Sequence, residues 1–141
     1  SKHALDQIEK KGIYPDIVVI LTEQYPFREK NIFDKMIKKL IKEDLDVVIT
    51  SKKINGGVWL KKNSNTPEIL IDGLVPNKLR NRNAFRTNIG LGCVVRPHNL
   101  RHENLYNGKV GFFNIQDALS LVSIRKNNIN TLSKKFSALI K

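Results

Sequence analysis

Apolar positions in the first third of the chain follow two distinct patterns. The segment Asp16–Leu21 is apolar throughout after its first residue, as expected for a strand that is covered on both faces. Over Ile32–Lys42, apolar residues recur at helical spacing with lysines on the other side, and Asn31 precedes them as a candidate N-cap. A second buried strand is predicted at Asp46–Thr50. Together these segments predict a strand-helix-strand unit with parallel strands.

The remaining pattern predicts shorter elements. Leu5 and Ile8, followed by Gly12, indicate a short N-terminal helix and its stop. The segment "GGVWLKKNSNTPEILIDG" is typical of two short strands joined by a polar turn, an antiparallel excursion from the main sheet. Residues 74–86 are basic and weakly patterned, which favours an exposed loop or arm. Further strands are predicted at 87–95, 109–115 and 119–124, and a last helix at 129–139.

These elements predict an α/β fold: a mostly parallel, Rossmann-like sheet with flanking helices and the small antiparallel excursion. At 141 residues the chain is long enough for one compact domain, and we expect residues 1–141 to form it. No apolar run approaches the ~20 residues needed to cross a bilayer, and the first residues lack the apolar core of a signal peptide. We therefore expect a cytoplasmic protein without a membrane partner.

Charge is distributed unevenly along the chain. Residues 1–46 hold nine acids and nine Lys or Arg, so the whole net charge of +12 lies after them. Residues 73–102 contain no acid, but they carry six bases: Lys78, Arg80, Arg82, Arg86, Arg96 and Arg101. Such a segment should attract anions, although net charge does not say whether the anion is a polynucleotide, a nucleotide or a sugar carboxylate. A solvated basic surface is the simpler alternative.

Polar residues follow the first predicted strand, where ligands of α/β sheets bind. Because that site lies beyond the carboxyl ends of the strands, residues 22–30 should line it. Gln24 offers an amide there, and Arg28 offers a two-pronged set of donors for a phosphate or carboxylate. We predict both as ligand-binding residues.

The order of these elements resembles the cytidylyltransferases that activate sugar acids, such as sialic acid, by transfer of CMP. That family has a buried "PDIVVxL" strand, a polar stretch, Ser-Pro-Leu-Arg, an amphipathic helix and a "DSVVSV"-like strand. This chain has "PDIVVILTEQYPFR", the helix and "LDVVIT" in the same order. Its "LRNRNAFRTNIGLGCVVRPHNL" is similar to the family's arginine-bearing loop and following strand, in the "YPFR" and "GLGCV" forms of a divergent branch. Glu23, Gln24 and Tyr25 depart from the usual Pro-Thr-Ser.

The resemblance implies a reaction and its partners. A hydroxyl of the sugar acid would attack the α-phosphorus of CTP and release pyrophosphate, with positioning and charge neutralisation as the main catalytic effects. The resemblance also implies a homodimer, in which a basic arm at about 74–86 reaches the neighbouring subunit. Three residues of this region are predicted to hold the sugar carboxylate or the triphosphate: Arg80, Arg82 and Arg86.

Two features of the family are missing from this sequence. The family begins with a strand and a glycine-rich loop that holds the CTP phosphates, so this chain resembles a partial nucleotidyltransferase domain, either a fragment or a truncated gene product. The family also binds Mg²⁺ through an Ile-Asp-Ile-Asp pattern near its C-terminus. Here Ser123 and Arg125 stand at those carboxylate positions, and a guanidinium cannot ligate a hard divalent cation. The sequence alone therefore assigns no catalytic residue and no metal ligand.

Other residues with useful chemistry give weaker signals. His98 and His102 are four residues apart with no third ligand nearby, which favours a helix surface over a metal site. Cys93 has no recognisable base partner and is interpreted as a buried structural thiol. Trp59 could stack on a base, but a core position is the commoner use.

Two other classes of function stay open. One is a basic module that binds nucleic acid or another polyanion, and the other is a non-catalytic remnant that dimerises. Binding that responds to CTP but not to oligonucleotides would favour the transferase, whereas strong salt-dependent binding to nucleic acid would favour the polyanion module.

Overall fold

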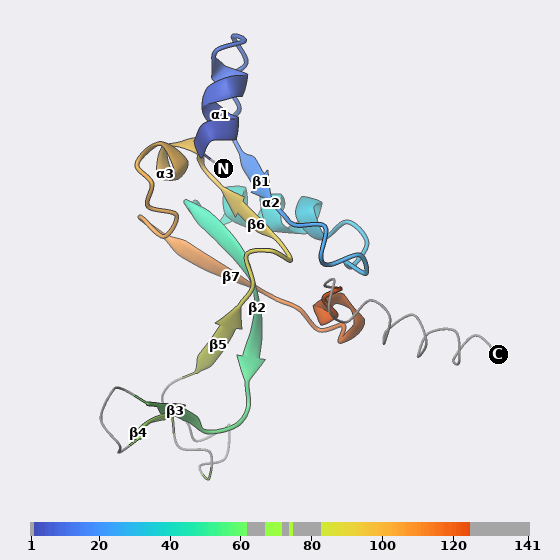
Figure 1. Ribbon diagram of the computed structural model, residues 1–141, viewed down its shortest axis with the longest axis vertical. Coiled ribbons are helices and arrows are strands. Elements are labelled where there is room, and N and C mark those ends of the chain that lie inside the picture. Colours follow the sequence, from blue (N-terminus) through green and yellow to red (C-terminus); the bar gives the residue numbers. More distant parts are fainter. Residues whose placement is uncertain (1, 62–66, 72–73, 75–82, 125–141) are drawn as a thin grey trace, which may run out of the picture.

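A computed structural model describes residues 2–61, 67–71, 74 and 83–124 (Figure 1). Its helices are α1 (Lys2–Glu9), α2 (Ile32–Lys42) and α3 (Pro97–Arg101), with a 3₁₀ turn, η2 (Leu119–Leu121). The strands are β1 (Val18–Ile20), β2 (Val47–Ile54), β3 (Val58–Leu60), β4 (Glu68–Ile71), β5 (Ala84–Thr87), β6 (Cys93–Val95) and β7 (Val110–Asn114).

Antiparallel pairings dominate the main sheet. Its strands follow the order β1-β6-β2-β5, and β7 pairs with β2. Strand β6 is antiparallel to both β1 and β2, β5 is antiparallel to β2, and only β7 is parallel to β2. The prediction of a mostly parallel, Rossmann-like sheet is therefore wrong. The strand-helix-strand unit does place β1 and β2 in the same direction, but β6 lies between them.

Both faces of this sheet carry a hydrophobic core. On one face α2 packs its buried side chains Ile32, Met36 and Leu40 against a cluster that contains Val48 and Val94. On the other face Val47 and Val95 join a cluster with Leu5 of α1 and Leu100 of α3. Adjacent residues of β2 and β6 thus point to opposite faces, as the pleat of a strand requires. A strand that is covered on both faces shows a continuous apolar run whether its neighbours are parallel or antiparallel. The apolar pattern therefore predicted which segments are buried but not the relative direction of the strands.

A second, two-stranded sheet extends from one end of the molecule (Figure 1). It consists of β3 and β4, which are antiparallel, so the predicted antiparallel excursion is present. Trp59 on β3 is 61% exposed, and its predicted core position is wrong. Four apolar side chains of this ribbon are exposed: Trp59, Leu60, Ile69 and Leu70.

Two local strand predictions also need correction. The segment predicted as one strand at 87–95 is interrupted, because β5 ends at Thr87 and a turn containing Gly90 and Gly92 precedes β6. The strand predicted at 119–124 is replaced by η2, whose Leu119 and Ser120 amides donate hydrogen bonds to Asp117. Two local acceptors favour a turn over an extended chain.

Asn31 precedes α2 but makes no side-chain capping hydrogen bond. Its backbone is left-handed, with φ 58° and ψ 26°, and its carbonyl accepts the first helical bond from Lys35. Asparagine tolerates this conformation better than most residues, so it serves the turn through its backbone. The helix predicted at 129–139 lies outside the described residues. Among the described helices, none combines the length and apolarity needed to traverse a bilayer.

Candidate functional site

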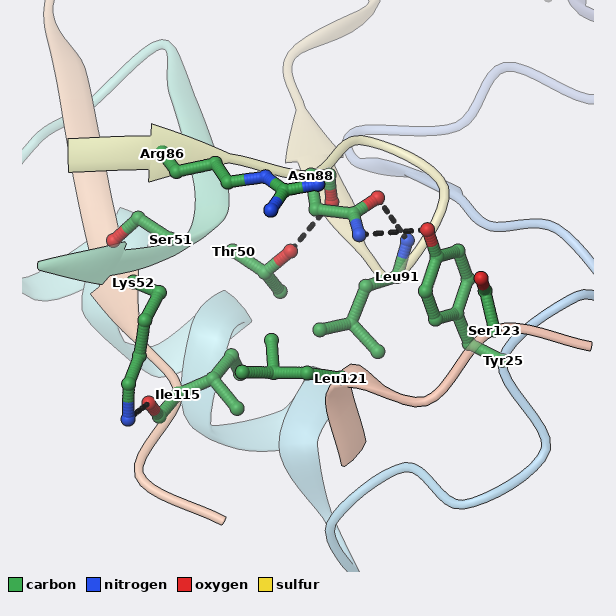
Figure 2. A pocket seen from close by; sticks show the side chains of 10 residues that line it. All are labelled: Tyr25, Thr50, Ser51, Lys52, Arg86, Asn88, Leu91, Ile115, Leu121 and Ser123. Atoms are coloured by element: carbon green, nitrogen blue, oxygen red, sulfur yellow. Dashed lines mark hydrogen bonds between the residues drawn. The ribbon is translucent and has the colours of Figure 1, made fainter. Parts of the chain in front are cut away.

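A pocket of about 180 Å³ lies where β1 and β7 end and where β2 continues toward β5 (Figure 2). The turn between β5 and β6 forms another wall, and the segment after β7 closes one side. Strands β1 and β7 reach this region with their carboxyl ends, whereas the antiparallel β6 begins beside it. Ten residues line the pocket: Tyr25, Thr50, Ser51, Lys52, Arg86, Asn88, Leu91, Ile115, Leu121 and Ser123.

Two cations occupy directly opposite positions in the wall of this pocket. Lys52 of β2 pairs with Arg86 of β5 in an antiparallel register, so the two side chains leave the sheet on the same face. The Lys52 ammonium donates a hydrogen bond to the Ile115 carbonyl at 3.0 Å. Arg86 forms no ion pair or side-chain hydrogen bond with any described residue. Like charges at opposed positions repel, and none of the lining residues is an acid that could neutralise them.

A hydrogen-bond network centred on Asn88 shapes the other wall. The Asn88 and Thr50 backbones are joined by an N–H to O bond of 2.9 Å, and the Thr50 hydroxyl donates to the Asn88 carbonyl at 2.5 Å. The Asn88 side chain donates through Nδ2 to the Tyr25 hydroxyl at 2.8 Å and accepts at Oδ1 from the Leu91 amide at 3.2 Å. This network fixes Tyr25, whose ring comes from the segment after β1, against the β5–β6 turn.

Arg28 joins the same two segments through backbone carbonyls. Its guanidinium donates to four carbonyls: those of Leu91 at 2.8 Å, Tyr25 at 2.6 Å, Gly90 at 3.1 Å and Thr22. These bonds use four of the five N–H groups of an arginine. Burial lowers the pKa of Arg28 from its ordinary value, although an arginine stays charged. Arg28 does not line the pocket, and its geometry is that of a clamp between loops.

The other predicted ligand-binding residues differ in their positions relative to the pocket. Gln24 is half-buried, and its carbonyl accepts a 2.8 Å hydrogen bond from the Ile124 amide, so it also joins two segments. Arg80 and Arg82 lie outside the described residues. Arg86 is the predicted residue that lines the pocket, but it does so from strand β5 and not from a loop.

Sequence reasoning missed Lys52, Tyr25 and Asn88 as parts of one site. Lys52 follows the apolar run of β2 just as residues 22–30 follow β1, so the argument used for the first strand could have found it. Asn88 gave no such signal. It reaches Tyr25 only because the β5–β6 turn folds back over the loop after β1.

The pocket does not fit a divalent metal. Ser123, at one of the positions where the resembled family carries a metal-binding carboxylate, lines the wall, and Arg125 lies outside the described residues. A Mg²⁺ site needs hard oxygen ligands, usually carboxylates, whereas this lining provides two cations and neutral groups. The described residues contain no cluster of three or more His, Cys, Asp or Glu side chains that could hold a metal. We derive no step through a metal.

Cys93 and the histidines lie elsewhere. Cys93 is fully buried in β6, and burial raises the pKa of its thiol to about 12, which makes it a poor nucleophile. His98 belongs to α3, and its Nε2 lies 3.4 Å from Oδ1 of Asp46, while His102 caps the same helix and is exposed. These contacts are structural.

No protein-family model matches this chain, and no curated protein matches it either. The resemblance to sugar-acid cytidylyltransferases therefore rests on the strand, helix and arginine motifs of the sequence, and the pocket is the structural feature that bears on function.

Proposed function

We propose that this chain binds a sugar acid as part of a cytidylyltransferase that moves CMP from CTP to that acid. Three features support the proposal: the order of the strand, helix and arginine motifs, the position of the pocket beyond β1 and β7, and the cations in its wall. The observation that carries it is the Arg86 guanidinium, which lines an acid-free pocket and lacks a counter-charge among the described residues.

In this proposal Arg86 binds the carboxylate of the sugar acid. A guanidinium matches a carboxylate with two parallel N–H donors. Lys52 adds positive charge, and two of its three N–H groups remain beyond the one bonded to Ile115. The neutral groups of Tyr25 and Asn88 orient the rest of the ligand. The chain thereby holds the acceptor hydroxyl ready to attack the α-phosphorus of CTP, with pyrophosphate as the leaving group.

Calorimetric titration with N-acetylneuraminic acid and with CTP tests the proposal. The variant Arg86→Gln removes the cation and keeps a polar side chain, and it should weaken sugar-acid binding about ten- to hundredfold, the effect of losing one charged hydrogen-bond pair. Lys53→Gln is the matched control, because it also removes one positive charge. Lys53 follows Lys52 on β2, and its side chain points to the opposite face of the sheet. Equal loss in both variants, or no binding by the wild type, would contradict a specific carboxylate site.

A homodimer is the second part of the proposal, and the β3–β4 ribbon supports it. Trp59 pairs with Ile69 across the ribbon, and their exposed fractions are 61% and 48%; Leu70 is 54% exposed. Exposed apolar side chains gathered on a two-stranded ribbon are typical of an interaction surface. Light scattering after size exclusion should give a dimer for the wild type and a monomer for Ile69→Lys. Ile41→Lys on α2, where the side chain is 61% exposed, is the control that should remain dimeric.

The acid-free basic segment supports a different candidate, a polyanion-binding module. Arg86 is exposed enough to contact a phosphate backbone. A twenty-nucleotide single strand distinguishes the two: backbone binding loses affinity steeply with salt and is insensitive to CTP and sugar acids. Competition by N-acetylneuraminic acid at constant ionic strength would favour the sugar-acid pocket instead.

A further inference from the structure

The direction of the hydrogen bond between Asn88 and Tyr25 is fixed by a third residue. The Leu91 amide can only donate, and it donates to Oδ1 of Asn88, so the opposite end of the Asn88 amide is the NH₂ group. That NH₂ group donates to the Tyr25 hydroxyl oxygen at 2.8 Å. The phenol oxygen is therefore an acceptor in this bond.

The hydroxyl proton of Tyr25 is consequently not used in this bond. A phenol can accept and donate at once, and no described residue accepts a hydrogen bond from the Tyr25 hydroxyl. The side chain is only 8% exposed and it lines the pocket (Figure 2). A hydroxyl proton in a nearly buried residue is more stable with an acceptor than without one, and an acceptor atom of a ligand in the pocket would provide it.

The position of this donor is rigid. Tyr25 lies between the Arg28 clamp, which binds its carbonyl, and the Asn88 amide, which binds its hydroxyl. A Cβ atom on Gly90 would lie 3.2 Å from the ring atom Cε2, so the β5–β6 turn packs tightly against the ring. A donor held at both ends is preorganised and discriminates between ligands at low entropic cost.

We propose that Tyr25 is a specificity-determining residue, which donates its hydroxyl proton to an uncharged oxygen of the ligand whose carboxylate Arg86 binds. This inference rests on the proposed sugar-acid function and names the group of the ligand that the second wall recognises. The ligand class is an acid with a carbonyl, hydroxyl or ring oxygen away from its carboxylate. Amines are excluded, because the lining carries two cations and no carboxylate.

Two probes of different size test this assignment by calorimetry: N-acetylneuraminic acid, which has such oxygens, and pyruvate, a carboxylate too short to carry a distant one. Tyr25→Phe should weaken N-acetylneuraminic acid binding about three- to tenfold, the range for one neutral hydrogen bond, and should change pyruvate binding less than about twofold. Arg86→Gln should weaken both. Tyr106→Phe, an exposed tyrosine outside the pocket, should change neither.

The outcomes separate the inference from the function on which it rests. If the wild type binds N-acetylneuraminic acid and Arg86→Gln loses it, but Tyr25→Phe binds it unchanged, the inference is overturned and the function stands. An equal loss for both probes in Tyr25→Phe also overturns it, because the ring would then act on the fold alone. No binding by the wild type overturns both. If Tyr25→Phe fails to fold, 3-fluorotyrosine in the wild type decides: a stronger phenol donor should tighten N-acetylneuraminic acid and not pyruvate.

Discussion

The ring of Tyr25 and the backbone of Gly90 are packed so closely that only glycine fits without adjustment. A Cβ atom at Gly90 would lie 3.0 Å from Oγ1 of Thr22 and 3.2 Å from Cε2 of Tyr25. The space beside this glycine thus sets where the tyrosine sits in the pocket, because the ring has to move if the space is filled.

Gly90→Ala should displace the Tyr25 ring and lower the free energy of unfolding by about 1–2 kcal/mol, as overpacking of a tight contact does. Urea denaturation measures the stability, and near-UV circular dichroism reports the environment of the ring. Gly56→Ala is the matched control, since a Cβ there would meet nothing within 4 Å. Equal effects of the two substitutions would mean that the contact with Tyr25 is not the cause.

Arg28→Lys should destabilise the fold although it keeps the positive charge. Lysine has a single ammonium and cannot reach the four carbonyls that Arg28 bonds on two separate loops. Leaving partly buried carbonyls without donors should cost about 2–4 kcal/mol by urea denaturation. Arg101→Lys should change stability little, because Arg101 is an exposed partner of Glu9. A variant as stable as the wild type would show that the clamp is dispensable.

Removing Arg86 should stabilise the sheet slightly while it weakens anion binding. Arg86→Thr relieves the repulsion with Lys52 across β2 and β5 and introduces a residue that strands favour. The free energy of unfolding should rise by about 0.2–1 kcal/mol, and more at low ionic strength than at high. Lys53 lies opposite the uncharged Phe85 in the same pair of strands. Its replacement, Lys53→Thr, should therefore show no such salt dependence. A loss of stability in Arg86→Thr would indicate that the cation supports the fold.

The thiol of Cys93 should make stability depend on alkaline pH. Its pKa is raised by burial from 9.0 to about 12, so above pH 9 the unfolded chain loses a proton that the folded chain keeps. Fewer protons bound in the unfolded state mean that stability falls as pH rises, by about 1.4 kcal/mol per pH unit between roughly 9 and 12. Unfolding of the wild type and of Cys93→Ala, compared at each pH, isolates this effect. Parallel profiles would contradict it.

Elements with strong local patterns were predictable from the sequence. The period of Ile32, Met36 and Leu40 identified α2. The apolar run Val47–Ile49 identified the first half of β2, which continues to Ile54 beyond the predicted end at Thr50. Cys93 was correctly interpreted as buried. These features depend on the alternation of apolar and polar side chains along a few turns or strand residues, which sequence displays directly.

Strand direction was not predictable in the same way. Val47 and Val94 are buried on opposite faces of the sheet, and both faces would be covered in a parallel as in an antiparallel arrangement, so the chain's apolar runs fit both. The direction of β6 depends on the conformation of the turn after Asn88. Asn88 is hydrogen-bonded to Thr50 and Tyr25, which lie in distant parts of the chain.

The sequence by itself determined the buried segments, the main helix and an acid-free basic region that should attract anions. Only the tertiary structure decided that Arg28 binds carbonyls, that Arg86 faces a pocket opposite Lys52, and that the Tyr25 hydroxyl accepts a hydrogen bond from Asn88. The reason is physical: burial follows from the composition of a few neighbouring residues, whereas the partner of a polar group depends on which distant segments pack together.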